Sequence, residues 1–151
     1  MSPPETNLPA LSLPEPIELL PHRPPFLFVD ELTELVPGER VAGRWTLTGE
    51  EAFFAGHFPG RPTLPGVLML ESLAQVGACG VLSEPRFEGK IPLFGAAAKV
   101  RFKRQVIPGE TLDVFVELTR LGTRAGKGHG QAMVGDEIAC QAELTFVIID
   151  A

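Results

Sequence analysis

The chain of 151 residues contains no tyrosine, one tryptophan, three histidines and two cysteines. So few cysteines exclude a disulfide-rich scaffold. We expect Cys79 and Cys140 to be free thiols in a reducing compartment, with a single disulfide as the alternative. The scattered histidines and cysteines also lack the spacing of metal ligands. We therefore expect neither a metal nor a redox cofactor.

Long hydrophobic runs and an excess of positive charge are missing as well. The 13 lysines and arginines are outnumbered by 19 aspartates and glutamates, which gives a net charge of −6. This balance argues against nucleic acid as a partner. No apolar run is long enough for a transmembrane helix or has the form of a signal peptide. We expect a cytoplasmic protein that binds neither nucleic acid nor a membrane.

Proline marks the first boundary in the chain. Residues 1–16 are rich in proline and poor in large apolar side chains, which predicts a flexible extension. Residues 17–151 are long enough to bury a core of their own and contain no internal repeat. We therefore expect a single domain from residue 17 to residue 151.

The stretch of residues 56–75 holds the main functional signals. Its sequence is GHFPGRPTLPGVLMLESLAQ. Proline suits the first turn of a helix because its missing N–H would lack a partner there. We predict a helix from Pro65 to Leu82, with Thr63 as its N-cap. This helix is apolar on nearly every side, which predicts that it is buried.

Glu71 is the one carboxylate in this apolar helix. A buried carboxylate is costly unless it is paired, hydrogen-bonded or neutral, and burial raises its pKa. Gln75 lies four residues on, on the same face, and can hydrogen-bond to it. A raised pKa suits a general acid, which must hold its proton near neutral pH. A purely structural buried glutamate is the alternative.

His57 precedes the predicted helix, in a turn surrounded by phenylalanines that include Phe58. A lone loop histidine is more often structural than catalytic, but this one lies 14 residues before Glu71 across a helix start. The N–H groups of Gly66 and Val67 would be unpaired there, at the positive end of the helix dipole. A base, an acid and a polarising N–H suit removal of a proton next to a carbonyl.

The same residues carry a family resemblance. Residues 57–75 read HFPGxPxxPGVLxxExxAQ, residues 20–30 read LPHRxPFLxVD and residues 99–109 read KxRFxRxVxPG. These motifs resemble those of the beta-hydroxyacyl-[acyl carrier protein] dehydratases of fatty-acid synthesis, the FabZ type. The resemblance covers roughly residues 17–149. The chain departs from the family pattern at Pro24, where a tyrosine is common.

The resemblance implies an α+β hot-dog fold, with an antiparallel sheet wrapped around one long helix. It implies His57 as the base and Glu71 as the acid, with Phe58, Gly66, Val67 and Gln75 as substrate-binding residues. Each site would lie between two subunits of a dimer, with the histidine and the glutamate from different subunits, and dimers would often assemble into hexamers. The related FabA-type enzymes carry aspartate in place of Glu71, which favours a dehydratase without isomerase activity. His22, from the first motif, is expected to be structural.

The remaining sequence predicts an antiparallel sheet. We predict strands at 26–36 and 40–48, joined by a turn at Pro37-Gly38. Apolar side chains then alternate along 98–102, 112–118 and 140–148, with a glycine-rich hairpin at 122–133 and a tight turn at 134–137. In the first of these runs, lysine and arginine take the alternate positions. This predicts one apolar and one cationic face.

The resemblance also names a partner, the acyl carrier protein, which is acidic. Basic residues gather between residues 86 and 104 of this acidic chain, and we predict that Lys99, Arg101, Lys103 and Arg104 dock the carrier. An ordinary solvated strand face is the alternative. Two other functions also stay open: a hydratase or thioesterase of the same fold that acts on CoA esters, and a non-catalytic acyl-binding module.

Overall fold

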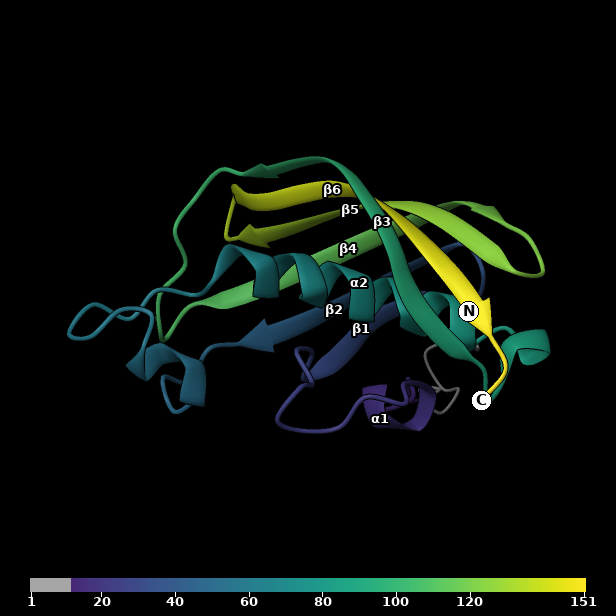
Figure 1. The fold of residues 1–151 in the computed structure, drawn as a ribbon, viewed down its shortest axis with the longest axis horizontal. Helices are drawn as coiled ribbons and strands as arrows, with labels where there is room; N and C mark the ends of the chain where they lie inside the picture. The colour runs from purple at the N-terminus through teal and green to yellow at the C-terminus, as the bar shows by residue number, and fades with distance from the viewer. Residues whose placement is uncertain (1–11) are drawn as a thin grey trace, which may run out of the picture.

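The computed structural model describes residues 12–151. One long helix, α2, lies against a six-stranded antiparallel sheet (Figure 1). The sheet order is β1-β2-β4-β5-β6-β3, so β1 and β3 form its two edges. The elements in chain order are α1 Pro16–Leu19, β1 Glu31–Val36, β2 Arg40–Thr46, η2 Ala52–Ala55, α2 Gly66–Leu82, η3 Pro85–Phe87, β3 Ile91–Phe102, β4 Thr111–Leu121, β5 Ala125–Val134 and β6 Glu137–Ile149.

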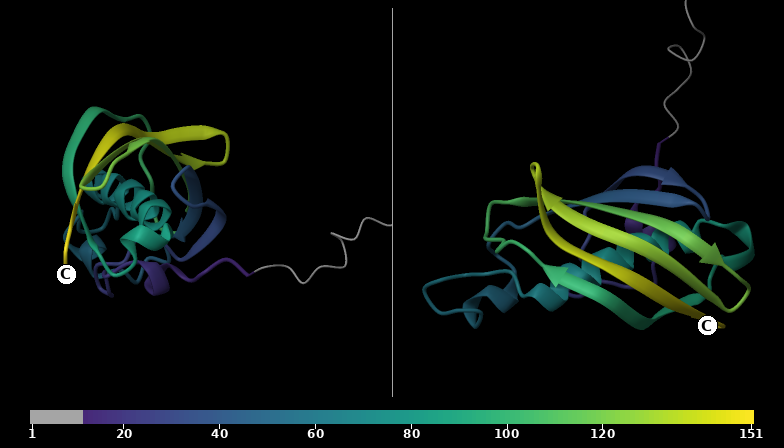
Figure 2. Two further views of the ribbon diagram at one scale, coloured as in Figure 1. Left: turned by 90° about the vertical axis from the view of Figure 1, so that its right-hand side faces the viewer. Right: turned by 90° about the horizontal axis from the view of Figure 1, so that it is seen from above.

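The sheet curves around α2, as the view along the helix shows (Figure 2). From Ser72 to Leu82 every residue of the helix is buried, which explains why the sequence is apolar on all sides. The inward-facing row of β6, from Cys140 to Ile148, is buried against it. This arrangement confirms the predicted α+β hot-dog fold.

The start of α2 differs from the prediction. The helix begins at Gly66, its N-cap is Pro65, and no side chain caps it. Thr63 as N-cap was wrong, because its hydroxyl donates to the Arg61 carbonyl at 3.3 Å and accepts from the Gln105 amide at 3.0 Å. The first N–H groups of the helix are therefore left without a side-chain acceptor.

The first strand is shorter than predicted. It begins at Glu31, not at residue 26, because the segment before it binds the helix instead of a neighbouring strand. The Phe28 N–H donates to the Gln75 side chain at 2.8 Å, and the Phe28 carbonyl accepts from the Ser72 hydroxyl at 2.7 Å. Sequence alternation does not reveal a backbone that pairs with side chains.

The alternation predicted for 98–102 was also wrong. The pairing of β3 with β6 shifts register between Ala98 and Arg101, and Lys99 takes a φ of 52° there. This bulge breaks the period of two, so the run has no single apolar face. In the described chain, Ala98 and Phe102 are both exposed. The turns at 37–38 and 134–137 were predicted correctly.

Glycines let the helix lie close to the sheet. A Cβ placed on Gly77 would lie 2.7 Å from Cζ of Phe146, and one on Gly80 would lie 3.0 Å from a methyl group of Val41. At either distance the neighbouring side chain would have to move to make room for the Cβ. Close packing here leaves no room for even one methyl group.

Several smaller predictions can now be compared with the structure. Cys79 and Cys140 are free and buried, and burial raises the pKa of each thiol to about 12. Of the predicted extension, residues 1–11 lie outside the described residues, and the buried Pro16 already begins α1. Within residues 12–151, no helix is long and apolar enough to cross a membrane.

Candidate active site

Glu71 lies in the second turn of α2, at the wall of a cavity of about 340 Å³. The other walls come from the loop after α1, through His22, and from β3 and β6, through Leu93, Phe94 and Phe146. The lining is mostly apolar. A carboxyl group here meets little water and few polar partners.

Gln75 holds Glu71 and the incoming loop together. Its side-chain nitrogen donates to Oε2 of Glu71 at 3.1 Å and to the Phe26 carbonyl at 3.2 Å, while its oxygen accepts the Phe28 N–H. Gln75 is 1% exposed, so these bonds are shielded from water. The predicted pairing of Glu71 with Gln75 is present, and it also fixes the loop before β1.

Burial raises the pKa of Glu71, and the hydrogen bond from Gln75 opposes that rise. Nε2 of His22 lies 3.8 Å from Oε2 of Glu71, a distance at which an ion pair could form. Burial lowers the pKa of His22, however, so both groups favour their uncharged forms. Burial therefore disfavours an ion pair between these two side chains.

His57 is held mainly by backbone groups. Its Nδ1 lies 2.7 Å from the Thr63 carbonyl oxygen. Because a carbonyl only accepts, Nδ1 carries a proton, and in the neutral imidazole the lone pair is then on Nε2. The His57 carbonyl accepts the Thr63 N–H at 2.8 Å, and the Phe58 ring stacks on the imidazole at 4.1 Å between centroids. This tautomer is the one that a general base needs.

The open end of α2 adjoins this histidine in the chain. Within the described chain, neither Gly66 nor Val67 donates its N–H to a carbonyl outside the helix. The Phe102 ring would lie 3.1 Å from a Cβ on Gly66, so a side chain would crowd this end of the helix. Val67 and Phe58 are 67% and 51% exposed, which leaves apolar surface around the free N–H groups.

The structure groups the predicted site residues in two sets. Glu71 and Gln75 lie together in the cavity wall, whereas His57, Phe58, Gly66 and Val67 lie before and at the start of α2. Among the described residues that line the Glu71 cavity, His57 is absent. His57 and Glu71, the expected base and acid, therefore do not line this cavity together.

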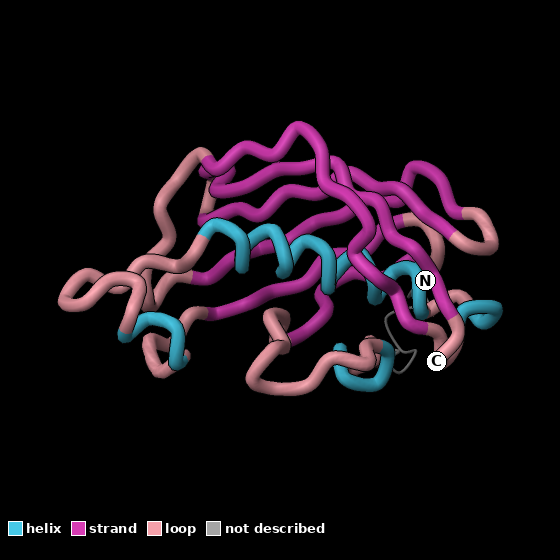
Figure 3. Tube along the Cα trace, in the orientation of Figure 1, coloured by secondary structure: helices cyan, strands magenta, loops and turns pink. Residues whose placement is uncertain are grey.

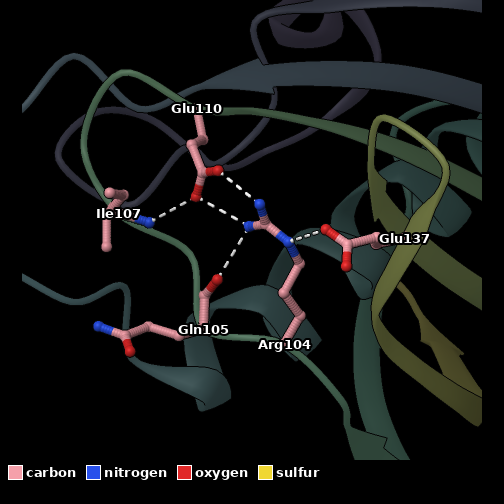
Figure 4. Close-up of polar contacts among 5 residues, drawn as sticks. All are labelled: Arg104, Gln105, Ile107, Glu110 and Glu137. Carbon is pink, nitrogen blue, oxygen red and sulfur yellow. Dashed lines mark hydrogen bonds and ion pairs between the residues drawn. The ribbon is translucent and has the colours of Figure 1, made fainter.

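The four predicted docking residues have different surroundings. Arg104 is bound to Glu110, Glu137 and a backbone carbonyl (Figure 4). Lys99 lies 3.6 Å from Glu143. Arg101 and Lys103 are exposed, and within residues 12–151 neither forms an ion pair.

Three contributions to the site were missed in the sequence. His22 was expected to be structural but lines the cavity beside Glu71. Ser72 binds the loop before β1, and a hydroxyl in an apolar helix one residue from Glu71 was an available signal. The Thr63 carbonyl sets the His57 tautomer, and no side-chain pattern reveals a backbone acceptor. In the part of the chain that the structure describes, no three His, Cys, Asp or Glu residues are grouped to hold a metal.

Known proteins place the chain in a family. Residues 20–143 match the family described as the FabA-like domain. The 3-hydroxyacyl-[acyl-carrier-protein] dehydratase FabZ of Natranaerobius thermophilus is 53% identical over 133 residues, which cover 88% of this chain and 94% of the relative. The enzyme of the same name from Chloroflexus aggregans is 49% identical over 140 residues, which cover 93% of this chain and 97% of the relative.

A solved structure supports the fold. The dehydratase heterocomplex ApeI:P from Xenorhabdus doucetiae superposes with a TM-score of 0.77 at 17% identity, over 89% of this chain and 91% of that one. At this identity the likeness concerns the fold alone. Membership of the family follows from the match over residues 20–143 and from identity to FabZ proteins at about half of the aligned positions. The chain belongs to the FabA-like family, among its FabZ dehydratases.

Proposed function

We propose that the protein is a hydro-lyase that removes water from (3R)-hydroxyacyl-[acyl carrier protein] to give the trans-2-enoyl thioester in fatty-acid elongation. The observation that carries this proposal is Glu71, a carboxyl whose pKa is raised by burial at the wall of an apolar cavity. The names of the relatives support the reaction, and the geometry supports the roles that we propose below for the residues.

His57 is the base. Its Nδ1–H is bound to the Thr63 carbonyl, so Nε2 takes the proton from the carbon next to the thioester. The electron pair of that C–H bond moves toward the carbonyl, whose oxygen gains negative charge. The N–H of Gly66, with that of Val67 and the helix dipole, would bind this oxygen. No side chain caps these donors, which leaves them open to substrate.

Glu71 is the acid. It gives its proton to the β-hydroxyl as the C–O bond breaks, and water leaves while the double bond forms between the α and β carbons. Gln75 orients the carboxyl by its bond to Oε2, which leaves Oε1 to carry the proton. At the end of the reaction His57 has gained one proton and Glu71 has lost one. Exchange with water restores both.

The complete site requires a second copy of the chain. The base and the acid belong to separate sets in one subunit. The edge strand β3 exposes small side chains at Ala96–Ala98, and among residues 12–151 no strand lies beyond it. We propose that two copies pair along β3, which brings His57 of one subunit to Glu71 of the other, and that such dimers assemble further into hexamers. The apolar cavity beside Glu71 would take the acyl chain.

Hydration of crotonyl-carrier protein, followed by the ultraviolet loss of the enoyl thioester, tests the reaction. Crotonyl-CoA and the His57→Ala variant are run beside it. Loss with the carrier substrate, slower loss with CoA and none in the variant would support the proposal. A preference for CoA would favour the CoA-linked alternative. Binding without turnover by wild-type protein would favour the acyl-binding module.

Mixing two inactive variants tests the shared site. When His57→Ala and Glu71→Gln subunits exchange at random, about a quarter of the sites should combine an intact histidine with an intact glutamate. Activity should therefore return to about a quarter of the wild-type value. If each subunit holds a complete site, mixing restores nothing. Each variant mixed with itself is the control.

Arg101 and Lys103 are the residues that we retain for docking the acidic carrier. Both are exposed, whereas Arg104 is engaged elsewhere. Charge reversal at both positions should raise KM for the carrier substrate severalfold at low salt, with a smaller effect at high salt. The KM for crotonyl-CoA should not change. An equal effect on both substrates would exclude docking.

We also place the enzyme in the cytoplasm, to which the two unpaired thiols are suited.

A further inference from the structure

Arg104 is the centre of a compact charged cluster in the loop between β3 and β4 (Figure 4). Its two terminal nitrogens donate to the two carboxylate oxygens of Glu110 at 2.9 and 2.7 Å, and its Nε donates to Glu137 at 2.8 Å. One terminal nitrogen also donates to the Gln105 carbonyl at 2.9 Å. Four of its five N–H groups are thus used, in the fork geometry that lysine cannot reproduce.

The cluster closes the loop on itself. Glu110 accepts the Ile107 N–H at 3.0 Å on the oxygen that also accepts from Arg104. The attraction of Arg104 lowers the pKa of Glu110, which keeps the carboxylate charged. The bond to Glu137 ties the loop to the first residue of β6. The loop from Lys103 to Glu110 therefore has a shape set by one guanidinium group.

That loop supports the segment that holds the base. The Val106 carbonyl accepts the Leu64 N–H at 2.8 Å, and both residues are buried. The Gln105 amide donates to the Thr63 hydroxyl at 3.0 Å. The two loops meet at the N-terminal end of α2, where Figure 3 shows them side by side. Thr63 in turn binds His57 through both its N–H and its carbonyl.

We propose that Arg104 is a positioning residue for His57, which it acts on through Gln105, Val106 and the Thr63 carbonyl. This inference rests on the proposed role of His57 as the base. The alternative is that the cluster only stabilises the two turns that it joins. The two roles differ in whether the imidazole of His57 is displaced in an Arg104 variant that stays folded.

Arg104→Met is the main test, with Arg40→Met as its matched control. Arg40 also binds a carboxylate, Glu34, at 2.9 Å on a hairpin of the same sheet, but no bond links it to the segment before α2. We expect Arg104→Met to lower kcat about 10- to 100-fold with little change in KM, because a small displacement of a catalytic group is costly. Arg104→Lys should not restore kcat. Arg40→Met should keep wild-type kcat.

A spectroscopic measurement separates this inference from the proposed function. The Nδ1–H proton of His57, identified by its loss in His57→Gln, should give a downfield, slowly exchanging signal in the wild type and lose that character in Arg104→Met. If Arg104→Met does not fold, Gln105→Leu serves, since it removes the bond to Thr63 alone. Unchanged kcat and an unchanged signal in a folded variant would overturn the inference. Wild-type protein without dehydratase activity would overturn the proposed function instead, and the signal would still decide the role of Arg104.

Discussion

The residues proposed here as acid and base, Glu71 and His57, are held in opposite ways. Glu71 is fixed from inside the fold, by a buried glutamine whose other bonds anchor the loop before β1. His57 is fixed near the surface by backbone groups of the segment before α2, and this segment is hydrogen-bonded to the β3–β4 loop. The acid is therefore tied to core stability, whereas the base is tied to loop geometry. Mutations should affect the two halves differently.

The largest expected effect is the loss of either catalytic group. His57→Ala and Glu71→Gln should each reduce turnover by about 10²–10⁴-fold, the usual contribution of a general acid or base. Both variants should stay folded, since His57 is near the surface and glutamine fits the Glu71 site. Stopped-flow assays of the enoyl thioester, with circular dichroism as a folding check, measure this. Near-normal turnover in Glu71→Gln would remove the acid role.

The open helix end predicts the next effect. Gly66→Pro removes the N–H proposed to bind the thioester oxygen and should lower kcat by about 10²–10³-fold. Proline is tolerated at the first position of a helix, and Pro65 already has the extended backbone that a following proline requires. Gly66→Ala is the matched control, because it adds a comparable Cβ against Phe102 but keeps the N–H. Equal losses in both variants would point to crowding.

The free energy of unfolding should also distinguish the surroundings of Glu71 from those of His57. Gln75→Leu leaves the buried Phe28 N–H without an acceptor, which should cost about 1–3 kcal/mol in the free energy of unfolding. His57→Ala should change that free energy little. Urea denaturation of both variants makes the comparison. A similar loss in the two would contradict the view that only the acid half is part of the core.

A smaller effect concerns pH. The folded state raises the pKa of Glu71 above its ordinary value of 4.5, so it binds the proton more tightly than the unfolded chain does. The stability that this binding contributes is full below pH 4.5 and is lost as pH rises through the folded pKa. The Glu71→Gln variant lacks this pH-dependent contribution to the free energy of unfolding. Its unfolding free energy relative to the wild type should therefore increase with pH across that window, and a constant difference would contradict the raised pKa.

The sequence was sufficient for the helix, for the buried row of β6 and for the pairing of Glu71 with Gln75. An apolar run behind a proline-glycine pair permitted few structures, and a lone carboxylate in it stood out. The bulge at Lys99 and the shortened β1 could not be predicted in this way, because each depends on backbone partners far along the chain. The different surroundings of Arg104 and Arg101 were also invisible. In sequence both are basic residues beside the same strand.

If the cavity beside Glu71 takes the acyl chain as proposed, the close approach of α2 to the sheet at Gly77 offers a way to change the acyl preference without altering a cavity residue. Phe146 lines the cavity beside Glu71, and its Cζ would lie 2.7 Å from a Cβ on Gly77. Gly77→Ala would therefore push the ring and reshape the cavity wall without touching the acid or the base. We expect the ratio of kcat/KM between short and long acyl substrates to change. A residue that never meets the substrate would then select its length.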